Sequence, residues 1–107
     1  MSSLQIHHHA KAYGHLSQAF YRLAVGEGNI KDRMIWASEE FLKVTPSMLP
    51  EGDLRESWDN LLKDMSRLDA QGYQTAFHAT IRRSRFSTVS TFAKRLSVIK
   101  TDLNNHI

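Results

Sequence analysis

A chain of 107 residues, 41% hydrophobic and 23% charged, is long enough to bury one core, so we expect a single domain over residues 1–107. It has no cysteine, which excludes disulfides and thiolate metal sites and fits a reducing, cytoplasmic setting. No apolar run is long enough to span a bilayer, and the N-terminus has no hydrophobic signal region. We therefore expect a soluble protein with no membrane partner.

The first half of the chain predicts two amphipathic helices. Apolar residues recur at three- and four-residue spacing over 3–25, which predicts one long helix there. Gly26-Glu27-Gly28 breaks this helix, and Asn29 is placed to cap the next one, with Asp32 in its first turn. The core stripe of this second helix runs from Ile30 to Val44.

A proline-containing corner follows, and then the most regular apolar seam of the chain. Thr45-Pro46 and Pro50 predict a tight corner or a single turn, because proline fits the first turn of a helix but not its interior. Apolar residues from Leu54 to Leu68 predict a third helix, which we expect to end at Gln71-Gly72.

Two further helices are predicted towards the C-terminus. A short stripe runs from Tyr73 to Ile81, a break is expected at 84–87, and Ser87 or Thr88 is placed to cap a last helix with its stripe from Val89 to Leu103. Convincing period-two alternation and hairpin signals are missing, so strands are not expected. The fold class is therefore all-α: an irregular antiparallel bundle of four to five helices.

The pattern of polar residues does not predict an enzyme. Consecutive residues on a helix diverge by about 100°, so the run His7-His8-His9 does not chelate one ion from a helical backbone. We expect His8 and His15 in solvent, and His9 at the core edge with a hydrogen-bond partner. The glycine pair around Glu27 lacks the third glycine and the lysine of a phosphate loop. No catalytic residue, metal or cofactor is expected.

Charge is distributed unevenly along the chain. Residues 70–101 carry six basic and no acidic side chains, while the whole chain has a formal net charge of +3, so the remainder sums to −3. An anionic partner would meet Arg82, Arg83, Arg85, Lys94 and Arg95. Two interpretations stay open: nucleic-acid binding by the basic stretch Arg82 to Lys100, or complementation of the acidic middle helices within a monomer or across a dimer.

Trp36 is the candidate centre of a protein interface. Its position lies opposite the core stripe of the second helix, where a large ring has no obvious internal partner. Ile35 and Leu42 widen the apolar surface on one flank. Either an intermolecular contact covers Trp36, or the corner at 46–53 folds back onto it.

Two short segments carry a family resemblance. The segments 23–28 (Leu-Ala-Val-Gly-Glu-Gly) and 79–83 (Ala-Thr-Ile-Arg-Arg) resemble parts of small, uncharacterised all-helical bacterial proteins, including those carried by integron cassettes on mobile elements. That group has no assigned activity, so the resemblance implies a helical fold and transfers no functional residue. We expect a non-catalytic accessory or regulatory protein that forms a homodimer and contacts a protein partner.

Overall fold

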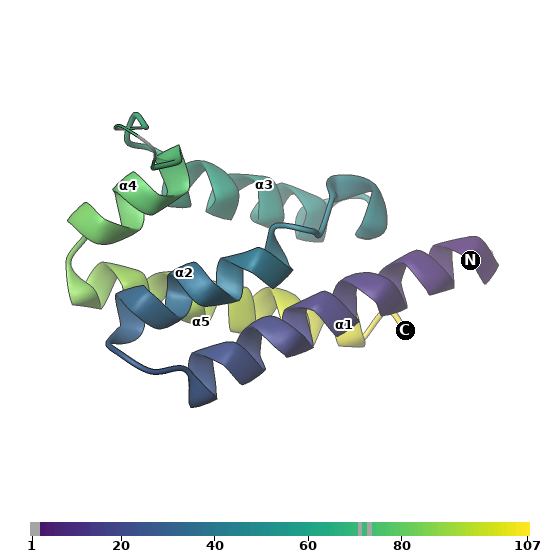
Figure 1. Cartoon of the computed structure of the whole chain (residues 1–107). Helices are drawn as coiled ribbons and strands as arrows, with labels where there is room; N and C mark the ends of the chain where they lie inside the picture. The colour runs from purple at the N-terminus through teal and green to yellow at the C-terminus, as the bar shows by residue number, and fades with distance from the viewer. Residues whose placement is uncertain (1–2, 71, 73) are drawn as a thin grey trace.

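The computed structural model describes residues 3–70, 72 and 74–107, and this part of the chain is mainly helical, without strands (Figure 1). It contains five α-helices and one 3-10 turn, which confirms the predicted all-α bundle. In chain order the elements are α1 (Ser3–Val25), α2 (Ile30–Phe41), η1 (Pro46–Met48), α3 (Asp53–Met65), α4 (Ala76–Arg83) and α5 (Phe86–Asn104).

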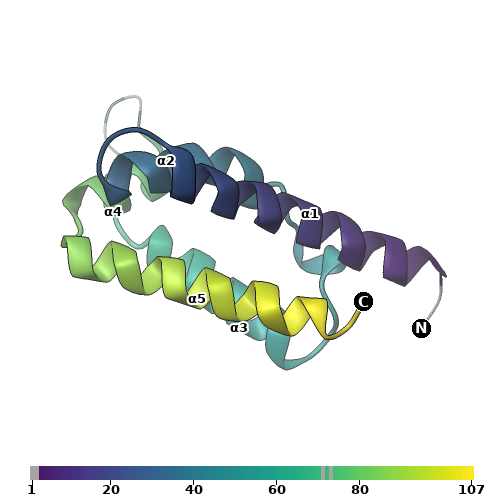
Figure 2. The same ribbon diagram turned by 90° about the horizontal axis from the view of Figure 1, so that it is seen from below.

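The helices pack as a small irregular bundle. α1 and α2 form a helical hairpin, and α5 runs beside both α1 and α3 (Figures 1 and 2). α4 lies at the end of the bundle opposite the two chain termini (Figure 1). At the other end, the N-terminal half of α1 and the end of α5 are neighbours (Figures 1 and 2). Side chains from these two ends can therefore contribute to one region.

The break between α1 and α2 forms as the sequence predicts. The Asn29 Oδ1 atom accepts hydrogen bonds from the backbone N–H groups of Lys31 and Asp32, at 2.9 and 3.1 Å. In return the Asp32 carboxylate accepts a hydrogen bond from the Asn29 N–H at 3.1 Å. This reciprocal capping box satisfies amide groups that the first turn of α2 leaves without helical partners.

An aromatic cluster joins three of the helices at the core. The ring of Phe41 on α2 meets Trp58 of α3 and Phe77 of α4 edge-on, with ring centroids 6.4 and 5.7 Å apart. Edge-to-face contacts of this kind add to the stabilisation from apolar burial. The predicted core stripes of α2 and α5 and the part of the α3 stripe up to Met65 pack around this cluster, whereas Ile6 and Ala24 of the stripe predicted for α1 are exposed. The fully buried side chains include Leu16, Met34, Leu61, Leu96 and Leu103.

The predicted end of the third helix is wrong. α3 ends at Met65, so Leu68 lies beyond the helix rather than in its seam, and Gln71 and Tyr73 lie outside the described residues. The Leu68 N–H donates to the hydroxyl of Thr80, 3.0 Å away on α4. A buried side chain of another helix thus supplies the acceptor that a longer α3 would have provided.

The predicted cap of the last helix is also wrong, although its core stripe is confirmed. α5 begins at Phe86, and the side chain of its N-cap residue, Arg85, makes no capping hydrogen bond within the described part of the chain. The Ser84 hydroxyl instead donates to the Thr80 carbonyl at 2.6 Å, back into α4. The break between α4 and α5 is therefore shorter than the serines and threonines of this segment suggest.

Candidate functional site

Trp36 lies on α2 with its ring held against α1. Its side chain is partly exposed, at 40%, and the Arg22 guanidinium carbon lies 5.0 Å from the ring centroid. The same guanidinium donates from Nη1 to the Trp36 carbonyl oxygen at 3.0 Å. A cation stacked on an indole face is attracted by the ring's quadrupole, so Arg22 both covers one face of the ring and fixes its orientation. The partner of Trp36 within the chain therefore comes from α1.

The tight approach of Trp36 to α1 depends on Gly26. A Cβ atom added at Gly26 would lie 3.1 Å from Cε3 of the Trp36 ring and 2.7 Å from the Arg22 carbonyl oxygen. Val25, immediately before this glycine, is 53% exposed. We use the name tryptophan surface for the patch formed by Arg22, Val25, Gly26, Trp36 and Glu39.

Charged side chains of both signs border the indole ring. Arg22 Nη1 donates to Glu39 Oε2 at 2.9 Å, and Arg22 Nη2 lies 3.6 Å from Glu40 Oε2. Glu40 also contacts His15 Nδ1 at 3.1 Å and accepts a hydrogen bond from Lys43 at 3.0 Å. These contacts, that of His15 above all, hold the pKa of Glu40 below its usual value despite the opposing effect of burial. His15, expected in solvent, is instead part of the α1–α2 contact.

Ile35 and Leu42 lie on a different face of α2 from Trp36. Ile35 is one position from Trp36 and Leu42 is six positions from it. At about 100° per residue, the two side chains therefore lie about 100° and 120° from Trp36 around the helix axis, in the same direction. Ile35 is half-buried and packs against the core, whereas Leu42, at the end of the helix, is 47% exposed. The structure thus brings Ile35 and Leu42 onto one face and Trp36 with Arg22 onto another.

Two of the five predicted anion-binding residues form ion pairs within the chain. Arg82 Nη1 lies 2.6 Å from Asp32 Oδ1 on α2, and Arg95 Nη1 lies 2.7 Å from Asp64 Oδ2 on α3. The hydrogen bond from Arg82 is the main reason that the pKa of Asp32 lies below its usual value. Part of the basic stretch therefore complements acidic residues of α2 and α3 inside the monomer.

The other three predicted cations occupy separate places. Arg83, the last residue of α4, and Arg85, immediately before α5, are exposed on either side of the buried Ser84, while Lys94 lies in the middle of α5. None of the three takes part in an ion pair within residues 3–70, 72 and 74–107. The structure therefore divides the predicted set into a group at the α4–α5 turn and a pair on α5.

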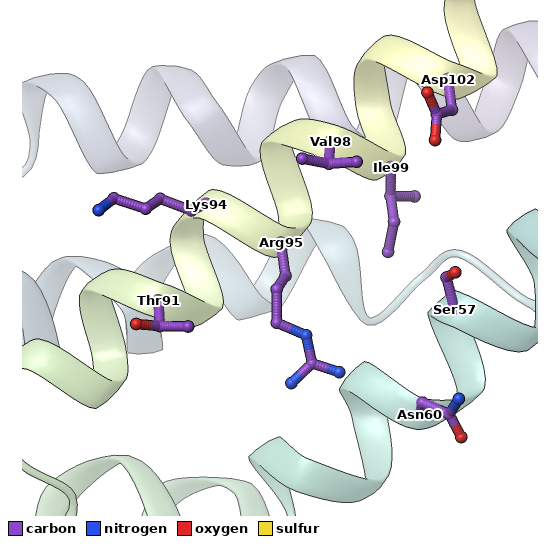
Figure 3. Close-up of a pocket in the computed structure, with 8 residues that line it drawn as sticks. All are labelled: Ser57, Asn60, Thr91, Lys94, Arg95, Val98, Ile99 and Asp102. Atoms are coloured by element: carbon purple, nitrogen blue, oxygen red, sulfur yellow. The ribbon is translucent and has the colours of Figure 1, made fainter.

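Lys94 and Arg95 line a groove between α3 and α5 (Figure 3). The groove has a volume of about 320 Å³ and is lined by Ser57, Asn60, Thr91, Lys94, Arg95, Val98, Ile99 and Asp102. Arg95 points across it towards α3, and Val98 is 60% exposed. Helical periodicity identifies Val98 as off the core stripe, but the groove itself depends on the pairing of two helices that are distant in sequence.

The described part of the chain has no cluster of side chains that could bind a metal ion. Among residues 3–70, 72 and 74–107, histidine, aspartate and glutamate side chains do not gather in a group of three that could hold an ion. Over the same ranges, each helix is too short or too polar to cross a membrane.

Comparisons of the chain with protein families, with curated proteins and with solved structures find no match.

Proposed function

We propose that this protein is a non-catalytic accessory or regulatory protein that self-associates through the tryptophan surface. The observation that supports this proposal is the state of Trp36, which is 40% exposed and yet held in one orientation by the Arg22 guanidinium. Tryptophan and arginine are the side chains most enriched among residues that dominate binding energy. A ring that is already oriented loses little freedom on binding, which leaves more of its contact energy for affinity.

A second copy of the chain suits the charges around Trp36. A two-fold symmetric contact places one patch against the same patch of its partner, so a patch with a single sign of charge would repel itself. The tryptophan surface instead carries a cation, Arg22, and an anion, Glu39, whose side chain is 67% exposed. Two copies can therefore meet with opposite charges facing each other and with Trp36 near the centre.

Such a contact must extend beyond the tryptophan surface. Stable interfaces bury about 800 Å² on each partner, which is roughly an eighth of the 6373 Å² of accessible surface here. The exposed sides of α1 and α2 next to Trp36 provide that continuation, and exposed Tyr21 of α1 adds apolar area near the same end of the helix.

Sedimentation velocity over a micromolar concentration series tests this proposal. We expect the wild-type sedimentation coefficient to rise with concentration, and Trp36→Ala to remain monomeric at every concentration. Leu42→Ala is the matched control, because it removes an exposed apolar side chain from a different face of α2 and should behave as wild type. A wild-type protein that stays monomeric throughout the series would contradict the proposal, as would equal effects of the two variants.

Nucleic-acid binding is a second candidate function, and the α4–α5 turn supports it. Arg83 and Arg85 are exposed there next to Phe86, which is 55% exposed, and arginines beside an accessible ring suit a single strand with stacked bases. Against it, Arg82 and Arg95 are already engaged by Asp32 and Asp64.

Fluorescence anisotropy with a labelled single-stranded oligonucleotide, at 50 and 200 mM salt, distinguishes the two functions. Binding that falls steeply with salt and is lost in the Arg83→Ala/Arg85→Ala double variant would support this second function; no binding at low salt would remove it.

A further inference from the structure

A pocket of about 560 Å³ lies where the N-terminal half of α1 meets η1 and the start of α3. Its lining residues are Gln5, His9, Ser47, Leu49, Pro50, Glu51 and Arg55. They come from three separate segments, so the pocket exists only once the chain has folded. The segments that form it lie at the end of the bundle that also holds the chain termini, away from the connection between α1 and α2 (Figure 1).

Two residues that line this pocket each have a buried side-chain nitrogen without a hydrogen-bond partner in the described part of the chain. His9 is 6% exposed, and its buried Nδ1 atom has no partner among the described residues. Arg55 donates from Nη2 to the Leu49 carbonyl at 2.7 Å, which fixes its guanidinium, while its buried Nε has no partner in the same part of the chain. Buried polar groups are nearly always paired in folded proteins, so these two nitrogens are the groups that an acceptor bound among these residues would satisfy.

The charges around the pocket favour an anion with a single negative charge. Burial, and then the nearby His106, His8 and Arg55, lower the pKa of His9, so Arg55 is the cation of the lining at neutral pH. Glu51 is the acidic residue in the lining, and it would repel a second negative charge on a ligand.

We propose that this pocket binds a small organic monocarboxylate, with the carboxylate group at Arg55 and His9 and the hydrocarbon part against Leu49 and Pro50. The planar guanidinium of arginine matches the two oxygens of a carboxylate, which a lysine ammonium does not. The backbone contact to Leu49 positions Arg55 before the ligand arrives. This binding site does not depend on self-association through Trp36.

Titration of the ¹⁵N-labelled protein with sodium butyrate, followed by NMR at constant ionic strength, tests the proposal. Sodium chloride is the matched salt control. We expect saturable shifts at His9 and in the first turn of α3, with a dissociation constant on the order of 1 mM, as suits a ligand of so few atoms. Shifts that do not saturate, or that chloride reproduces, would overturn the proposal.

Three variants locate the site. Arg55→Lys should weaken butyrate binding by about fivefold or more, whereas Arg83→Lys, at the other end of the bundle, should leave it unchanged. Glu51→Gln should strengthen binding by about two- to threefold, because it removes the repulsive charge from an exposed position. The expected gain in butyrate affinity of Glu51→Gln keeps the test decisive if Arg55→Lys does not fold. Equal binding by all variants, or tighter binding of inorganic phosphate than of butyrate, would show that the monocarboxylate site is wrong.

Discussion

Arg82 on α4 and Asp32 on α2 are 50 positions apart in sequence and form an ion pair at 2.6 Å. The same Asp32 closes the capping box of α2 by accepting a hydrogen bond from Asn29. Lys31 adds a second link, because its Nζ donates to the Arg82 carbonyl at 3.1 Å. The start of α2 and the end of α4 are thus joined by complementary charges, which absorbs part of the basic stretch into the fold.

Removal of this ion pair should destabilise the protein in a salt-dependent way. Arg82→Ala is expected to lower the free energy of unfolding slightly in dilute buffer, because both partners are partly exposed and screened. The difference from wild type should shrink as sodium chloride is added. Urea unfolding at two salt concentrations measures it, with Arg83→Ala as the control. The same loss in Arg83→Ala would show that general charge, rather than the pair, is responsible.

Acidification should destabilise the protein through His9. The pKa of His9 is lowered in the folded state, from a usual value of 6.5, by burial and by His106, His8 and Arg55. Below pH 6.5 the unfolded chain therefore binds a proton that the folded chain resists, so stability falls as the pH falls through this range. Urea midpoints measured from pH 7.5 to 5.5 should fall for wild type and fall less for His9→Phe. Parallel pH profiles would contradict the role of His9.

Two glycines in the N-terminal region should respond to alanine in opposite directions. Gly26→Ala places a Cβ 2.7 Å from the Arg22 carbonyl oxygen, so it should cost about 1–3 kcal/mol of stability through overpacking. Gly14 lies within α1, and outside the backbone of its own helix and its chain neighbours no atom of the described residues lies within 4 Å of an added Cβ. Gly14→Ala should instead stabilise by about 0.5–1 kcal/mol, because alanine is the better helix former. Chemical denaturation of both variants gives the comparison, and a neutral Gly26→Ala would argue against the close approach of Trp36.

The hydroxyl of Thr80 should matter more than its position in a helix suggests. This fully buried group donates to the Ala76 carbonyl at 2.8 Å and accepts from the Leu68 N–H at 3.0 Å. Thr80→Val leaves that N–H without its acceptor, which should cost about 1–3 kcal/mol. Thr91→Val is a matched control, since the Thr91 hydroxyl bonds to the Ser87 carbonyl at an exposed site. Unfolding free energies of the two variants should differ clearly, and equal values would contradict this account of the end of α3.

Sequence periodicity predicts the features of this fold that are set within one helix. The bounds of α1, the cap at Asn29 and the buried stripe of α5 all follow from spacing of three and four residues and from the chemistry of a single side chain. The end of α3 does not follow in this way, because its acceptor, Thr80, comes from another helix.

The candidate sites are harder to predict because they form between helices. Trp36 is recognisable from α2 alone, but its contact with Arg22 depends on how α1 packs against α2. The groove between α3 and α5 and the pocket around His9 likewise depend on tertiary pairing. Sequence reasoning places His15 in solvent and does not single out Arg22, because the direction from which α2 approaches α1 is not known from the sequence.

The most direct test of self-association is the fluorescence emission of Trp36 as the protein concentration rises. Trp58, the other tryptophan, is fully buried, and Trp58→Phe leaves Trp36 as the sole indole reporter once retention of the fold is checked by circular dichroism. We predict that emission shifts to shorter wavelength over the same micromolar range in which the sedimentation coefficient rises, because a second copy covers the exposed part of the ring. Emission that stays constant while the protein associates, or a protein that never associates, would contradict the proposed interface.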